Sequence, residues 1–121
     1  MNKKRELVNY LIEVIQNMER EEGRRITYTE FAKRVDLPIK TVTVFFDIED
    51  TRLPSRRNAE MIAIGLNSNR INQILGYDEI DYKYLELMHT TKKLDPGDQD
   101  KILRLIREWK KNPNSFEAVT A

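Results

Sequence analysis

The sequence predicts an all-α protein in which five helices are followed by a C-terminal helical hairpin. Apolar residues recur at intervals of three and four, as they do along one face of a helix, and no segment shows the alternation of a strand. Residues that cap helices precede most of these apolar stretches. Of the 121 residues, 40% are hydrophobic and 34% are charged, a composition that fits a small protein with a modest core.

The pattern divides the chain into three parts. We expect residues 1–77 to form one helical domain, and residues 78–111 to form a helical hairpin that is a candidate dimerisation element. Residues 112–121 lack any apolar period, so they are expected to be a flexible tail.

The first helix is expected from Lys3 to Glu22. Its buried stripe consists of Leu7, Leu11, Val14, Ile15 and Met18. Gly23 fits the left-handed position that commonly ends a helix. The basic residues Lys3, Lys4 and Arg5 are expected to be a frayed, solvated terminus rather than a DNA-binding arm.

Two short helices are predicted next, over residues 28–35 and 38–46. Thr27 and Glu30 have the spacing of a capping box, which marks the start of the first of them. Pro38 lacks an amide donor and disfavours a helical residue before it, so it enforces a break between the two. Helices this short, joined by so tight a turn, cross steeply and leave one face of the second helix free.

A fourth and a fifth helix are predicted after the loop that follows residue 46. Ser55 is positioned to cap the fourth helix. The apolar residues of this helix are Ala59, Ile62, Ala63 and Leu66. A turn at residues 67–69 precedes the fifth helix, over residues 71–75, which stops at Gly76.

The hairpin is predicted from two further capped segments. Asp78 or Asp81 can cap the first segment, which carries Tyr84, Leu85 and Met88. Asp95 followed by Pro96 has the order expected at the start of the second segment, which carries Ile102, Leu103, Ile106 and Trp109. These apolar faces would form a large exposed patch on an isolated chain, so they either meet a second copy or fold back on residues 3–22.

Composition and motifs argue against several classes of function. The chain has no cysteine, which excludes disulfides and thiolate metal sites and favours a reducing compartment such as the cytoplasm. A single histidine leaves little for metal ligation, and no apolar run approaches the length of a membrane span. No catalytic motif and no glycine-rich phosphate loop occur. We therefore expect no enzyme activity, no cofactor, no metal and no membrane partner.

The two short helices and the turn between them carry apolar residues at Phe31, Ala32, Val35, Leu37, Val42 and Phe45. With these positions as its core, the segment from Leu7 to Tyr77 resembles the phage-repressor (Cro/Xre-like) helix-turn-helix family. Thr27 and Glu30 match the cap of its second helix, and the spacing from Pro54 to Leu66 matches its fourth. The resemblance implies a repressor-like domain of five helices. Residues 94–106 also resemble the C-terminal helix attached to some of these repressors.

The resemblance implies a sequence-specific DNA-binding transcriptional regulator of repressor type, which reads the major groove of double-stranded DNA with helix 38–46. The implied base-reading residues are Ile39, Lys40, Thr43 and Val44. The implied phosphate-binding residues are Tyr28, Arg52, Arg56 and Arg57. One such unit reads only a few base pairs, so a homodimer on half-sites about one helical turn apart is expected.

The sequence departs from the pattern of the family in three ways. Tyr28 replaces a frequent Gln, Asp36 replaces a frequent Gly, and Ile39 and Val44 put apolar side chains where polar readers are common. Apolar groups can meet thymine methyls, while Lys40 can donate to guanine.

The sequence leaves other interpretations open. The chain has a net charge of only +1, and residues 38–50 are net acidic. The competing interpretation of the arginines of residues 52–57 is an ordinary solvated face, with Arg57 paired to Glu60. An alternative function is a protein-interaction module whose apolar face would be Ile39, Val44 and Phe46. The antitoxin of a toxin–antitoxin pair, which would use the same scaffold, is equally compatible with the sequence.

Overall fold

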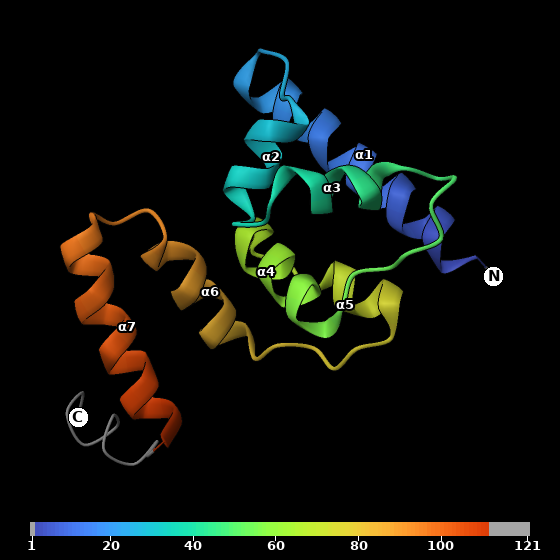
Figure 1. Ribbon diagram of the computed structural model, residues 1–121. Coiled ribbons are helices and arrows are strands. Elements are labelled where there is room, and N and C mark those ends of the chain that lie inside the picture. The colour runs from blue at the N-terminus through green and yellow to red at the C-terminus, as the bar shows by residue number, and fades with distance from the viewer. Residues whose placement is uncertain (1, 112–121) are drawn as a thin grey trace.

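The computed structural model describes residues 2–111, and every regular element in that range is an α-helix. The prediction of an all-α protein is thus confirmed for this part of the chain. The expected tail, residues 112–121, lies outside the described residues. The helices, labelled in Figure 1, are α1 (Lys3–Glu22), α2 (Tyr28–Arg34), α3 (Ile39–Phe46), α4 (Arg56–Leu66), α5 (Arg70–Leu75), α6 (Tyr82–Thr91) and α7 (Pro96–Lys111).

The helices begin at the capping residues that the sequence indicates. Thr27 Oγ1 accepts a hydrogen bond from the amide of Glu30, and Ser55 Oγ accepts one from the amide of Asn58. Of the two candidates for α6, Asp81 is the cap, since its carboxylate accepts from the amides of residues 83 and 84. Each cap satisfies an amide that has no partner within its helix.

A four-residue turn, residues 35–38, separates α2 from α3. Asp36 adopts a left-handed conformation with φ of 54°, which reverses the chain. The amide of Leu37 then donates to the carbonyl of Ala32 at 3.1 Å, which closes the end of α2. Pro38 lies just before the first residue of α3, where its missing amide costs no hydrogen bond within the helix. α2 consequently packs directly against α3.

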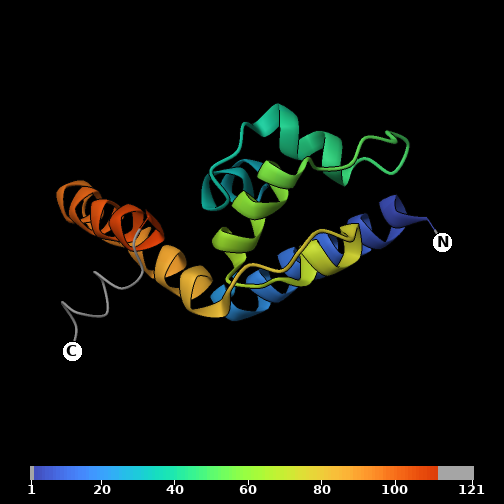
Figure 2. The same ribbon diagram turned by 90° about the horizontal axis from the view of Figure 1, so that it is seen from below.

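The core lies between α1, α2, α3, α4 and α5. Its largest fully buried side chains include Phe31, Leu7, Leu11, Ile62 and Ile71. α1 packs against both α3 and α5, and Figure 2 shows α1 and α5 running side by side. None of the described helices is long and apolar enough to cross a membrane.

α6 folds onto α4, not onto residues 3–22, and α7 packs against α6. Leu85 of α6 is 1% exposed and belongs to the same buried core as α1–α5. His89 Nδ1 lies 2.8 Å from the carbonyl oxygen of Ile64, which fixes the end of α6 on α4. In Figures 1 and 2, α7 lies on the far side of α6 from the other helices.

Two expectations from the sequence are wrong. Lys4 is not part of a solvated terminus, because its side chain is buried and hydrogen-bonded. Phe46 does not contribute to an apolar surface, because it is 8% exposed and its ring meets Phe31 edge-on at a centroid distance of 5.4 Å. Both residues instead fix the position of α3.

Candidate nucleic-acid interface

The outward face of α3 carries most of the side chains expected to read bases. Ile39, Lys40 and Thr43 are exposed, whereas Val42, on the opposite face, is buried. Thr43 Oγ1 donates to the carbonyl of Ile39 at 2.8 Å, which holds the Thr43 side chain along the helix. Val44 is half-buried and packs against the core, so only part of its side chain is open to a partner.

Tyr28, at the start of α2, is held against α3 by ring stacking. Its ring lies over that of Phe46, with centroids 4.3 Å apart and 19° between the planes. Tyr28 remains 45% exposed, so one side of the molecule presents an aromatic ring of fixed orientation beside α3. A ring fixed in this way loses little conformational entropy on binding.

Arg52 lies in the loop between α3 and α4, where it is engaged by a neighbouring acid. Its Nη2 lies 2.6 Å from Asp50 Oδ2, and its Nε lies 3.0 Å from Asp50 Oδ1. This hydrogen bonding by the guanidinium holds the pKa of the Asp50 carboxyl well below its usual range. The Arg52 side chain is still 71% exposed, so phosphate can approach it, but in competition with Asp50.

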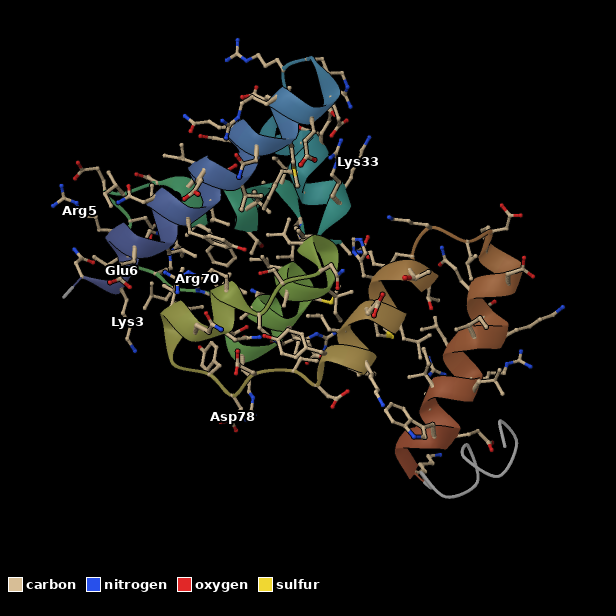
Figure 3. The ribbon with its side chains drawn as sticks, turned by 180° about the vertical axis from the view of Figure 1, so that it is seen from behind. Lys3, Arg5, Glu6, Lys33, Arg70 and Asp78 are labelled. Atoms are coloured by element: carbon tan, nitrogen blue, oxygen red, sulfur yellow. The ribbon has the colours of Figure 1, made fainter. Side chains whose placement is uncertain are left out.

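Arg56 and Arg57 occupy the first turn of α4, where Ser55 caps the helix. Arg57 is exposed and has no ion-pair partner among residues 2–111; the expected pair with Glu60 does not form. Arg56 lies 3.4 Å from Asp78, on the loop between α5 and α6 (Figure 3). Both partners of this pair are highly exposed, which makes it weak.

Lys4 is the residue of this region that sequence reasoning missed. Its Nζ donates to the carbonyl of Val44 in α3 at 2.8 Å and to the carbonyl of Arg52 at 2.9 Å. Burial lowers the pKa of the Lys4 ammonium, while the carboxylates of Asp50 and Asp47 oppose that shift. The burial of Lys4 could have been predicted from the sequence, since position 4 lies three residues before Leu7, on the extension of the buried stripe of the first helix.

The structure therefore joins several of the expected site residues. Tyr28 is joined to α3 through the stacked ring of Phe46, and the Arg52 loop is joined to α3 through Lys4. Arg56 lies apart from these residues. It lines a separate cavity of about 380 Å³ together with Asp78, Tyr84 and Trp109.

No protein-family model, no functionally characterised protein and no solved structure matches this chain.

Proposed function

We propose that this chain is a sequence-specific DNA-binding transcriptional regulator of repressor type, in which α2 and α3 form a helix-turn-helix and α3 enters the major groove. The proposal rests on one observation: one face of α3 is buried in the core and the other is exposed. Its inner side chains, Val42 and Phe45, are anchored in the core, while Lys40 and Thr43 face outward from a pair of short helices that pack together. This is the arrangement by which such a pair presents a helix to base edges.

The exposed side chains of α3 have the chemistry for reading bases. Lys40 can donate to the O6 and N7 acceptors of guanine, and the methyl groups of Ile39 and Thr43 can contact thymine methyls. The half-buried Val44 would contribute at its exposed edge only. Contacts of this kind specify sequence, whereas contacts to phosphate fix the position of the protein on the duplex.

Tyr28, Arg52 and Arg57 are the proposed phosphate contacts. Tyr28 is held at the start of α2 beside α3, and the guanidiniums of Arg52 and Arg57 are largely exposed. Arg56 would join them only by leaving Asp78, which costs little because that pair is solvent-exposed.

A homodimer is part of the proposal, and α7 is the surface we assign to it. Asp100 and Arg107, seven residues apart on one side of this helix, are both exposed. Residues 96–101 carry two acids and one lysine, whereas residues 102–111 carry four basic residues and one acid. A two-fold axis across α7 would place two copies antiparallel, so that the acidic half of each faces the basic half of the other. The helix dipoles would then also be opposed in sense.

Titration with duplex DNA over a range of salt concentrations tests the proposal. Each phosphate that the protein neutralises should contribute about 0.9 to the slope of log affinity against log salt. Selection of bound sequences from a random pool should then recover a motif with two-fold symmetry. No binding at low salt, or binding without any recovered motif, would contradict the assignment.

A protein-interaction module is the second candidate, favoured by the acidic end of α3. Asp47 and Glu49 are exposed there, beside Ile48, which is 49% exposed. Phosphate would be repelled by this segment, whereas a basic protein partner would be attracted. An antitoxin would combine the two candidates, with DNA on α3 and a toxin on another surface. Absence of DNA binding at low salt would favour the protein partner.

A further inference from the structure

Lys4 joins three segments that are distant in the sequence. The residue lies in the first turn of α1 and is 6% exposed. Its ammonium bridges the carbonyl of Val44, near the end of α3, and the carbonyl of Arg52, in the loop before α4. These two carbonyls belong to the helix proposed to read bases and to a residue proposed to bind phosphate.

The negative charge around the end of α3 explains why the buried group at position 4 is an ammonium. The carbonyl of Val44 lies in the last turn of α3, at the negative end of the helix dipole, and besides Lys4 it accepts from the amide of Asp47 at 3.2 Å. Asp47 and Asp50 follow directly and add negative charge. A buried cation at this point satisfies the carbonyls and offsets the acids, which would otherwise repel one another and open the loop.

We propose that Lys4 is a positioning residue for DNA binding, which holds α3 and the Arg52 loop in one fixed relation. The inference rests on the proposed function. DNA then meets base-reading and phosphate-binding groups that are already aligned, and no ordering of the loop is required when the complex forms. Lys4 itself need not touch DNA.

The adjacent lysine supplies a matched control. Lys3 Nζ donates to the carbonyl of Leu75 at 3.2 Å, and its side chain projects at the start of α1 (Figure 3). Lys3→Met therefore removes the same charge and a similar hydrogen bond, but it leaves α3 and the Arg52 loop untouched. Lys4→Met keeps the length of the side chain and removes only the ammonium.

The first measurement is amide hydrogen exchange on the full chain without DNA. Lys4→Met should speed exchange across residues 47–53 by about tenfold or more, because the loop then opens locally. Lys3→Met should leave exchange there unchanged. Circular dichroism confirms that each variant is folded, and Lys4→Gln, which keeps an N–H donor, replaces Lys4→Met if the latter unfolds. Unchanged exchange in a folded Lys4 variant overturns the inference whether or not the protein binds DNA.

The second measurement is a double-mutant cycle with Arg52→Ala on duplex DNA. Lys4→Met should weaken binding roughly five- to tenfold, and it should lower the salt slope by about 0.9, as if the Arg52 contact itself were lost. Adding Arg52→Ala to Lys4→Met should then change little. Additive effects, or an unchanged salt slope, would refute the positioning role. If wild-type protein fails to bind DNA while the exchange result holds, the proposed function fails and Lys4 is a structural residue only.

Discussion

The ammonium of Lys92 lies 2.9 Å from the carboxylate of Asp36 and 2.8 Å from the carbonyl of Arg34. Lys92 directly follows α6, and Asp36 is the left-handed residue of the turn between α2 and α3. The C-terminal helices are thereby bonded to the turn that sets the direction of α3. Docking of α6 and the shape of the proposed helix-turn-helix are thus energetically linked.

Replacement of Lys92 by Met should lower the free energy of unfolding by about 1 kcal/mol, the usual contribution of a partly buried hydrogen bond. The ion pair with Asp36 should add little, because that carboxylate is more than half exposed. Urea unfolding followed by circular dichroism measures the change. Lys93→Met, at the exposed neighbouring position, is the control and should be close to neutral. Equal losses from the two variants would show that the contact contributes nothing.

Gly65→Ala should destabilise the protein by about 2 kcal/mol or more through overpacking. A Cβ at position 65 would lie 2.6 Å from the carbonyl oxygen of Arg34 and 2.9 Å from Val35 Cα, so the backbones of α4 and α2 would have to separate. Thermal unfolding measures the effect. Gly97→Ala in α7 is the matched control. A Cβ there meets nothing within 4 Å, and stability should stay the same or rise by up to about 1 kcal/mol, as helix propensity predicts.

Helix positions were predictable from this sequence because local chemistry determines them. Thr27 and Ser55 cap through their own side chains, and Pro38 breaks the chain by its own covalent structure. The partners of Lys4 were not predictable, because they lie 40 and 48 residues away along the chain. Docking of α6 on α4 was missed for the same reason, since an apolar face does not specify the helix that covers it.

Only part of the candidate site could be predicted from the sequence. The resemblance to the repressor family placed Lys40 and Thr43 outside and Val42 inside, as the structure has them. Phe46 lies at the last position of α3, where the helical period no longer decides its direction, and its burial depends on stacking with Tyr28. Pairing of Arg52 with Asp50 depends on the course of the loop, which no periodic pattern describes.

Asp50→Asn should strengthen binding to all DNA sequences by several-fold at low salt. The substitution releases the guanidinium of Arg52 and removes one negative charge beside the proposed interface. Fluorescence anisotropy with a mixed-sequence duplex measures the change, which should shrink as salt rises. Glu49→Gln removes the same charge without releasing an arginine, so it should give a smaller gain. A weaker complex with Asp50→Asn would mean that the pair positions Arg52 for DNA.

The carboxyl of Asp50 has a lowered pKa, so the pair with Arg52 should resist acid. Because the folded-state pKa is depressed, the stability that the ion pair contributes is fully present above the unfolded-state pKa of about 4. That stability is lost only as the pH falls through the lower folded-state pKa. Between pH 7 and pH 5 the DNA affinity should therefore show no rise from protonation of Asp50. The wild-type and Asp50→Asn proteins should keep a constant affinity ratio across this range. A ratio that converges toward one near pH 5 would contradict the assignment of the pair.

Arg57→Ala and Lys40→Ala should separate positioning from specificity. Arg57 is expected to contact phosphate, so its loss should weaken binding to every sequence and reduce the salt slope by about 0.9. Lys40 is expected to contact a base, so its loss should cost about 1–3 kcal/mol on the preferred sequence and relax preference at one position. Binding measurements on the selected site and on its single-base variants distinguish the two. Equal effects of both substitutions on all sequences would contradict this division.

The segregated charges of α7 predict how its variants should pair. If two copies meet antiparallel along this helix, Asp100→Lys places basic groups opposite a basic half, and Arg107→Glu places acids opposite an acidic half. Each variant alone should therefore shift from dimer to monomer in sedimentation equilibrium. An equimolar mixture of the two variants should recover dimers. In the mixed dimer, the lysine introduced at position 100 of one copy faces the glutamate introduced at position 107 of the other.

Leu105→Asp should leave the dimer intact, because Leu105 lies about 150° around α7 from the side that carries Asp100 and Arg107. Lys83→Glu changes a charge on α6 by the same amount as Arg107→Glu does on α7, and it should also leave the dimer intact. Dimers that survive Asp100→Lys and Arg107→Glu would place the two-fold contact on another surface. If the wild-type protein is itself a monomer, two independent copies would have to bind the two half-sites. The affinity for the two-fold site would then no longer depend steeply on the spacing between the half-sites.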